Sequence, residues 1–233
     1  LVAHDAQTRF TWLNDVKDEL WKRDLIADCV KKGVPHDPKT CNGPHFGGTS
    51  HAGLINEKTL KTLKGIGITY LDYGLEHWDN KILRNLGKGA TADANKKSIK
   101  LTMAAGISPI PNQIIMFPDE SWDSLNTMLD AWKDTGIVTS PFICTPYPGA
   151  EWYIKYKDFI LEQYEGSLEA FINDLEDATK VTALLTKNFT PAEAIGIQKI
   201  MSEAAITGDF VNAKRLLAFS KKMKENVTVS QKN

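Results

Sequence analysis

Polar side chains of the kinds that bind ligands stand directly after the apolar runs that this sequence predicts to be strands. The run GITYLDYGL, residues 67–75, is followed by Glu76, His77 and Asp79. A carboxylate at the buried end of a strand needs a partner, and the amine or hydroxyl groups of a ligand would serve. Glu76 is therefore the first candidate for ligand binding.

The neighbouring runs end in polar groups as well. The run PIPNQIIMF, residues 109–117, is followed by Asp119 and Glu120, and a short strand expected near residues 45–50 ends in the sequence GGTSH. Ligands of parallel α/β proteins bind at the C-terminal ends of the strands. If the strands close into a barrel, one rim is expected to hold Thr49, Ser50, His51, Glu76, Asp119, Glu120 and Tyr147.

Most of these groups also have a structural explanation. Asp79 is placed to cap a helix over residues 80–86, and this is the stronger expectation for it. Asp119 and Glu120 stand where a helix dipole stabilises carboxylates. His77 can pack beside its neighbour, and a lone histidine at residue 51 is more often structural than a ligand. Among these residues, Glu76 is the one for which a purely structural role is the weakest explanation.

Regular alternation of strands and helices predicts the elements that must position these groups. Capping residues Asn56, Thr91 and Ser121 begin helices, and Gly106 and Gly136 follow the ends of the last two. A further amphipathic helix is expected over residues 13–31, and a strand is expected within residues 136–145. The pattern indicates βαβ units, a parallel sheet of four or five strands and an α/β fold.

The pattern changes after residue 150. From Trp152 onward the sequence indicates only helices and loops, with Thr190, Pro191 and Glu193 forming the start of one helix. We expect an α/β part over residues 1–150 and a helical C-terminal region over residues 151–233.

Composition excludes several classes of protein. The 233 residues carry a formal net charge of −1 and 42% hydrophobic residues, which is typical of a globular protein with a substantial core. Without a clustered basic excess we expect no nucleic-acid or membrane partner, and no apolar run approaches the roughly 18 residues of a membrane span. Three cysteines, an odd number, argue against a disulfide framework and favour a reducing compartment, the cytoplasm.

Familiar catalytic and metal-binding motifs are absent. The sequence holds no C-x-x-C loop, no H-E-x-x-H, no Walker loop and no G-x-G-x-x-G, and no Ser-His-Asp or Cys-His arrangement is recognisable. The residues alone therefore predict an α/β protein with a ligand-binding rim, no metal ligands and no assignable catalytic residue.

Three motifs in order resemble segments of the radical S-adenosylmethionine (radical SAM) enzymes. They are LKGIGITYLDYGLEHWDNKILRNLGKGAT, AGISPIPNQIIMFPDESWDSLNTML and TPYPGAEWY. The last resembles a segment of the family branch that carries a cobalamin-binding domain. The resemblance covers about residues 45–155 well and the flanks loosely.

The resemblance implies a fold, cofactors and partners. It implies the later strands of a partial (β/α)6 TIM-like barrel that holds a [4Fe-4S] cluster and S-adenosylmethionine. Such enzymes generate a 5'-deoxyadenosyl radical or transfer a methyl group to a small-molecule substrate, with electrons from a flavodoxin or ferredoxin. A cobalamin-binding domain is implied upstream.

The resemblance also assigns residues. Glu76 corresponds to a polar residue near the S-adenosylmethionine pocket, and His51, with Ser50 and Thr49 beside it, falls where relatives place an arginine that touches the cofactor. Asn112 and Gln113 would line the adenine side. Tyr147 and His77 would approach the substrate.

Departures from the family pattern leave alternatives open. The C-x3-C-x2-C loop that binds the cluster is absent, and the Ser-Gly expected after the glutamate is His77-Trp78. The simplest interpretation is a fragment that lacks the N-terminal part of the same protein, including the cluster ligands, and that is inactive alone. The alternatives are a cluster-free α/β module that binds a ligand or partner, and a closed (β/α)8 enzyme of another class.

Overall fold

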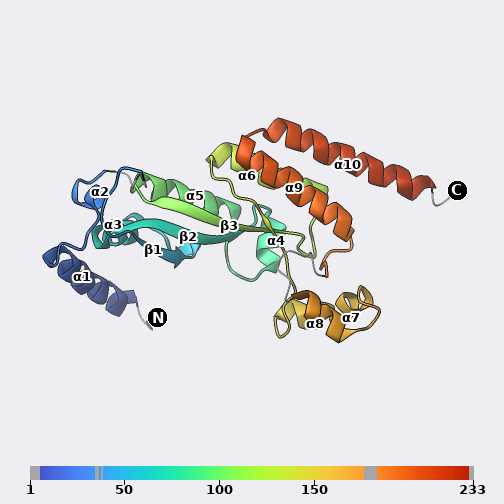
Figure 1. Ribbon diagram of the computed structural model, residues 1–233, viewed down its shortest axis with the longest axis horizontal. Coiled ribbons are helices and arrows are strands. Elements are labelled where there is room, and N and C mark those ends of the chain that lie inside the picture. The colour runs from blue at the N-terminus through green and yellow to red at the C-terminus, as the bar shows by residue number, and fades with distance from the viewer. Residues whose placement is uncertain (1–5, 35–36, 38, 176–182, 231–233) are drawn as a thin grey trace. The chain divides into compact units, whose positions relative to one another are not determined.

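The computed structural model describes residues 6–34, 37, 39–175 and 183–230 (Figure 1). Within it the chain forms two compact units. The first unit comprises residues 1–75 and 89–111, and the second comprises residues 76–88 and 112–233. Each unit is described by itself.

The first unit combines helices with the beginning of a parallel sheet. Its elements are α1 (Ala6–Lys22), α2 (Asp28–Lys31), β1 (Phe46–Ser50), the 3-10 helix η1 (Ala52–Leu54), α3 (Glu57–Ile66), most of β2 (Ile68–Glu76), α5 (Ala92–Ala104) and the start of β3 (Ser108–Ile115). β1 pairs in parallel with β2, with Gly47 opposite Tyr70 and Ser50 opposite Tyr73.

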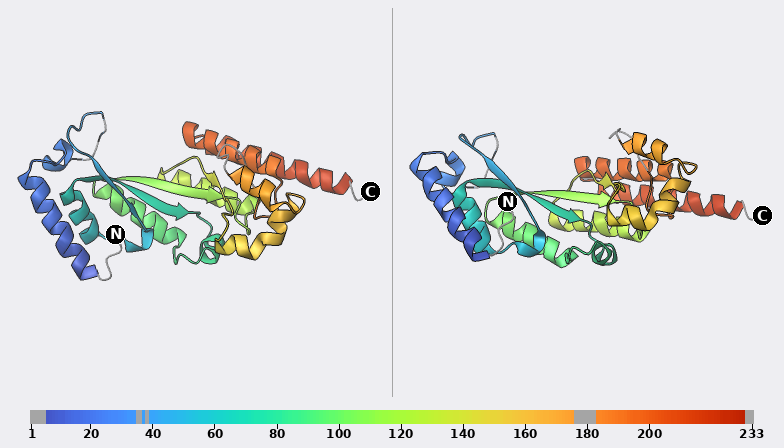
Figure 2. Two further views of the ribbon diagram at one scale, coloured as in Figure 1. Left: turned by 60° about the horizontal axis from the view of Figure 1, so that its bottom comes forward. Right: turned by 90° about the horizontal axis from the view of Figure 1, so that it is seen from below.

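The second unit contains the strand ends and all later helices. Its elements are α4 (Asn80–Asn85), the end of β3, α6 (Trp122–Thr135), β4 (Phe142–Ile143), α7 (Glu151–Glu162), α8 (Leu168–Leu175), α9 (Pro191–Thr207) and α10 (Phe210–Ser230). α9 and α10 run side by side, and α10 also packs on α6 (Figures 1 and 2).

The sheet has four strands in the order β1-β2-β3-β4. β1 with β2, and β3 with β4, are parallel pairs, and helices separate successive strands along the chain. This confirms the predicted α/β fold, the later strands of a partial barrel followed by a helical C-terminal region. The predicted boundary at residue 150 stays a prediction.

Helix caps agree closely with the sequence. The side chains of Asn56, Asp79, Thr91 and Ser121 each accept a hydrogen bond from the first turn of the helix that follows. Thr190 does the same for α9, where the Glu193 carboxylate in turn accepts the backbone amide of Thr190 and completes a capping box. Because caps depend on a few neighbouring residues, local sequence is sufficient to identify them.

Two elements differ from the prediction. The expected helix over residues 13–31 is two helices, because α1 ends at Lys22 and Asp24 has a positive φ of 56°. Ile26 and Ala27 in the break are buried, so packing of this segment in the core overrides the helical pattern. The strand expected within residues 136–145 is reduced to Phe142–Ile143.

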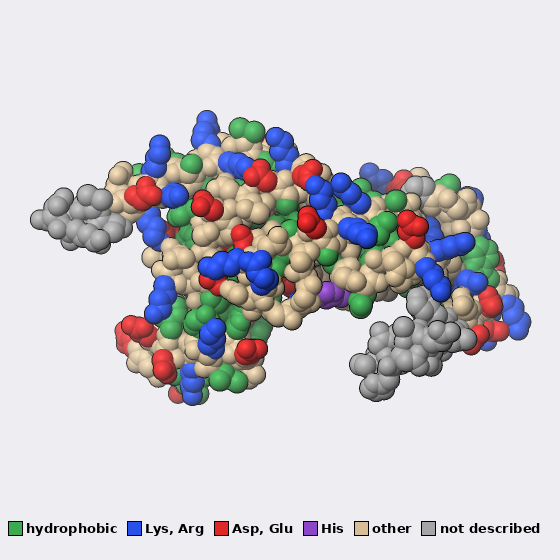
Figure 3. Space-filling model, turned by 180° about the vertical axis from the view of Figure 1, so that it is seen from behind, with side chains coloured by type: hydrophobic (Ala, Val, Ile, Leu, Met, Phe, Trp, Pro, Cys, Tyr) green, Lys and Arg blue, Asp and Glu red, His purple; other side chains and the backbone are tan. Residues whose placement is uncertain are grey.

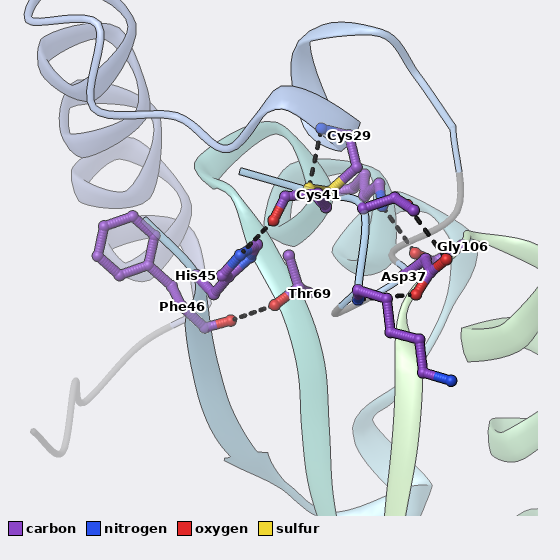
Figure 4. Close-up of a disulfide and its surroundings, with 10 residues drawn as sticks. Cys29, Asp37, Cys41, His45, Phe46, Thr69 and Gly106 are labelled. Carbon is purple, nitrogen blue, oxygen red and sulfur yellow. Dashed lines mark hydrogen bonds between the residues drawn. A yellow bond between two sulfur atoms is a disulfide. The ribbon is translucent and has the colours of Figure 1, made fainter. Parts of the chain in front are cut away.

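A disulfide joins Cys29 and Cys41 (Figure 4). Their Cα atoms are 5.4 Å apart, and the amide of Cys29 also donates to Sγ of Cys41 at 3.0 Å. This corrects the expectation that the cysteines stay unpaired, which rested on their number alone. A loop of this length stabilises a fold by about 3 kcal/mol. The cysteine count therefore gives no argument for a reducing compartment.

Surface charge is mixed on the face drawn in Figure 3, where lysine and arginine side chains are interspersed with aspartate and glutamate side chains. Among the described residues, no helix combines the length and the apolar character that crossing a membrane requires.

Candidate functional site

Glu76, the last residue of β2, has a strained backbone conformation. Its φ of 60° lies in the left-handed region, which costs a residue other than glycine of order 1–3 kcal/mol. The Glu76 side chain is 10% exposed and forms an ion pair with the ammonium of Lys88, which is 47% exposed. Within the described chain this ammonium is the one partner of the Glu76 carboxylate. A flexible, half-exposed lysine is a partner that a ligand can replace.

Lys88 was not among the candidate residues identified from the sequence. Gly87 and Gly89 on either side of it have φ values of 67° and 65°, so the chain turns sharply at both positions. The signal available in the sequence was the unpaired charge of Glu76, because a carboxylate at a buried strand end requires a cation or a donor.

His77 is buried and held in one tautomer. Its Nδ1 accepts a hydrogen bond from the amide of Asp79 at 2.9 Å, so the proton of the neutral ring lies on Nε2. Nε2 lies 3.4 Å from Oε1 of Glu120, and both side chains have no exposed surface. The His77 side chain is therefore shielded from solvent. Its contact with a substrate stays a prediction.

The turn after β3 is organised around Glu120. Oε2 of Glu120 accepts the amide of Met116 at 2.8 Å, and Met116 has a φ of 67°. Oε1 accepts the hydroxyl of Ser124 from the first turn of α6. The carbonyl of Glu120 accepts the side-chain amide of Asn188 at 2.8 Å. Glu120 thus stabilises the strained turn and ties it to the region before α9.

Gln113 lies on the helix side of β3. Its Oε1 accepts hydrogen bonds from the indoles of Trp78 and Trp132, both at 2.7 Å. Because indole nitrogens only donate, this fixes the orientation of the amide. Nε2 of Gln113 finds no acceptor among the described residues.

Asn112 and Gln113 do not share a face. Neighbouring residues of a strand point to opposite sides of the sheet, and here Asn112 is exposed while Gln113 is completely buried. The expectation that both line the adenine side stays a prediction. Asn112 keeps the exposed position, and its contact with a cofactor stays a prediction.

Burial holds the pKa of the Cys144 thiol at about 12, with a smaller contribution from the Glu120 and Glu76 carboxylates. The thiol is 8% exposed and lies in an apolar cluster with Phe117 and Tyr153. A thiol that stays protonated at neutral pH is neither a nucleophile nor a ready metal ligand.

The remaining candidates are less enclosed. In the first unit, Thr49 and Ser50 lie on β1, and Nδ1 of His51 accepts the amide of Gly53 at 3.1 Å. This hydrogen bond caps η1, as the structural explanation of a lone histidine predicts. In the second unit Tyr147 is 62% exposed. Their contacts with a cofactor or substrate stay predictions.

No group of three His, Cys, Asp or Glu side chains among the described residues could hold a metal ion. Two of the three cysteines are joined in the disulfide, and the third is the buried Cys144. The donor set of this chain therefore does not fit a [4Fe-4S] cluster, which needs thiolates.

Comparison with protein families gives one match in the strand-bearing part of the chain. The sequence profile of the Radical SAM superfamily matches residues 15–132, which include both strand-end turns.

Two curated proteins are similar over part of their length. An uncharacterized methyltransferase of Pyrococcus horikoshii is 31% identical over 102 residues, 43% of this chain. A provisionally named methylthiotransferase of Methanocaldococcus jannaschii is 31% identical over 101 residues, 42% of this chain. The aligned part is 22% of the length of each relative.

Solved structures give weaker similarities. The radical S-adenosylmethionine methyltransferase TsrM of Kitasatospora setae has a TM-score of 0.46 at 15% identity, over 61% of this chain and 26% of that protein. The cobalamin-dependent enzyme OxsB has a TM-score of 0.42 at 22% identity, over 68% of this chain and 21% of that protein.

Proposed function

Because this chain belongs to the radical SAM superfamily, we propose that it forms part of an enzyme that binds S-adenosylmethionine and catalyses methyl transfer to a small molecule. The names of the two curated relatives, a methyltransferase and a methylthiotransferase, support this reaction class. When bound, S-adenosylmethionine supplies either a methyl group or a 5'-deoxyadenosyl radical.

The observation that carries the proposal is the state of Glu76. Its carboxylate is nearly buried, is held by a strained backbone at a strand end, and is paired only with the half-exposed ammonium of Lys88 among the described residues. The ammonium or the hydroxyl groups of S-adenosylmethionine can take the place of Lys88 and donate hydrogen bonds to the Glu76 carboxylate. The strain then has a purpose, because it fixes the carboxylate before the ligand arrives.

The proposal locates cluster binding outside these 233 residues, because the cysteines of this chain do not fit a cluster. The parent enzyme would supply the [4Fe-4S] ligands from its N-terminal part. We further propose a cobalamin-binding domain there, a flavodoxin or ferredoxin as electron donor, and a cytoplasmic location. The chain by itself is then inactive.

A second candidate function is a cluster-free module that binds a ligand or partner protein. It is favoured by the same donor set, since a chain that never binds a cluster needs no free thiolates. The two candidates differ in what precedes the chain. An open reading frame upstream that contains Cys-x3-Cys-x2-Cys supports the enzyme, and a start codon at Leu1 supports the module.

Binding of S-adenosylmethionine tests the role of Glu76. We expect titration calorimetry of the purified chain to show weak binding that Glu76→Gln reduces about tenfold, as loss of one charge-assisted hydrogen bond predicts. Glu162→Gln, at the exposed end of α7, is the matched control and should leave binding unchanged. Equal binding by the Glu76→Gln variant would contradict the assignment.

A further inference from the structure

A cavity of about 550 Å³ lies within the first unit, between the end of α1 and the helices α3 and α5. All of its lining residues belong to this unit, and the proposed function uses none of them. Protein sites for small molecules commonly have volumes of about 300–1,000 Å³. The cavity is therefore large enough for a small-molecule ligand.

The exposed lining of this cavity is mostly apolar. Leu60 lines it from α3, and Leu101 and Ala105, one helical turn apart on α5, line it from the other side. The indole of Trp21 adds a wall and donates a hydrogen bond to the carbonyl of Gly65 at 2.7 Å. This bond fastens the end of α1 to α3, on which α1 packs (Figure 2). The walls are thus in place before a ligand binds.

Lys64 brings a charge to the apolar lining. It is half-buried, and its ammonium donates a hydrogen bond at 2.7 Å to the carbonyl of Gly106, the residue after Ala105. An ammonium has three donors, so this neutral carbonyl leaves donors for another partner. No carboxylate of the described residues forms an ion pair with Lys64, and burial lowers its pKa. An anionic partner would stabilise the charged form of Lys64.

The other charged groups near the cavity do not supply that anion. Glu57 and Lys61 line it one turn apart on α3, and both are exposed, so their opposite charges offset each other. Lys17 of α1, which lies beside α3, forms an ion pair with Asp18 at 3.4 Å. Two lysines against one glutamate leave the lining with one net positive charge, and the surplus lies on Lys64.

We propose that this cavity binds a medium-chain fatty acid, with its aliphatic chain against Leu60, Leu101 and Trp21 and its carboxylate on the Lys64 ammonium. A flexible chain can fill an aliphatic cavity and gains free energy for each methylene that leaves water. A nucleotide or a sugar would lose the hydration of its polar groups against these walls without gaining partners. The site requires neither a cluster nor S-adenosylmethionine.

Decanoate is the probe that tests this site on the full chain. Titration calorimetry below the micelle-forming concentration should show one site with a dissociation constant on the order of 0.1 mM, as expected for a ligand of this size. Decylamine has the same chain length and should bind at least about tenfold more weakly, because its ammonium meets Lys64. Decylamine binding as tight as that of decanoate would overturn the proposal.

A lysine variant tests the role of the charge. Lys64→Met keeps the length of the side chain and should weaken decanoate about tenfold, as loss of a charge-assisted hydrogen bond predicts, while binding of the neutral analogue decanol stays unchanged. Lys100→Met is the matched control, because this lysine of α5 is exposed and does not line the cavity, and it should change neither ligand. Unchanged decanoate binding by Lys64→Met would refute the assignment of the carboxylate to Lys64.

A larger side chain tests the place of binding. Ala104 lines the cavity from α5 and is exposed, so Ala104→Trp fills the cavity without entering the core and should weaken decanoate and decanol at least about tenfold. Met103→Trp, at a residue that is 50% exposed on another face of α5, should change neither. Circular dichroism establishes that each variant is folded. Decanoate binding that survives in Ala104→Trp, or no decanoate binding to the wild-type chain, would refute the site.

Discussion

The turns at the ends of β2 and β3 share a strained backbone conformation, but the strain has a different role in each. A residue other than glycine has a positive φ at each of them, Glu76 as the last residue of β2 and Met116 directly after β3. Each also contains a glutamate. The Glu120 carboxylate is completely buried and accepts hydrogen bonds from the Met116 amide and from Ser124, whereas the Glu76 carboxylate reaches only the flexible Lys88 among the described residues.

This difference separates a structural carboxylate from one that is available to a ligand. The hydrogen-bonding capacity of Glu120 is used within the fold, and the Asn188 side chain adds a bond to its main-chain carbonyl. The capacity of Glu76 is met by one replaceable ion pair. Strain alone therefore does not identify a functional residue, because at Met116 the fold itself supplies the compensation.

The largest expected effect comes from removing Glu120. We expect Glu120→Ala to lower the free energy of unfolding by about 3–5 kcal/mol, because it leaves the Met116 amide buried without its acceptor and removes the buried carboxylate beside His77. Urea denaturation measures this. Glu76→Ala, whose carboxylate holds no amide, should cost far less, and equal losses would remove the distinction between the two turns.

Cys144 reports on the environment that both glutamates share. Its pKa is about 12 in the folded chain against an ordinary value of 9.0, so the folded state holds the proton more tightly. The contribution of Cys144 to stability is therefore complete below pH 9 and is lost as the pH rises toward 12.

Because of this thiol, the free energy of unfolding should be about 1.4 kcal/mol lower at pH 10 than at neutral pH. The difference in free energy of unfolding between wild type and Cys144→Ala, measured at pH 7 and pH 10, isolates it from other titrating groups. A difference that does not change with pH would show that the thiol is not buried beside the carboxylates.

The smallest effect has opposite signs for stability and binding. Glu76→Gly should raise the free energy of unfolding by about 1 kcal/mol, because glycine adopts positive φ without strain, and should weaken S-adenosylmethionine binding. Met116→Gly should instead destabilise the chain, since it removes a completely buried side chain. Thermal denaturation and calorimetry measure both quantities, and a destabilised Glu76→Gly variant would contradict a role for strain at Glu76.

Much of the fold could be predicted because it depends on local patterns. β1, β2 and β3 and the five caps follow from short apolar runs and single capping residues. The break at Asp24 and the disulfide could not be predicted, since both depend on how distant segments pack.

The site was predicted only in part. Position after a strand identified Glu76 and the cap Asp79, but the ion pair with Lys88 and the contact of His77 with Glu120 join residues 12 and 43 positions apart. Strand alternation in the sequence would have shown that Asn112 and Gln113 face opposite sides. The acceptor role of Gln113 could not be predicted, because it needs two indoles from different elements.

Hydrogen exchange with and without S-adenosylmethionine tests the difference between the two turns most directly. We predict that saturating ligand increases the protection of amides in residues 74–79 and 86–89, where Glu76 exchanges its Lys88 partner for the ligand. Amides of residues 116–124 should already be protected and should not change. Added protection confined to residues 116–124, or none in either turn, would contradict the assignment of Glu76 as the ligand-binding carboxylate.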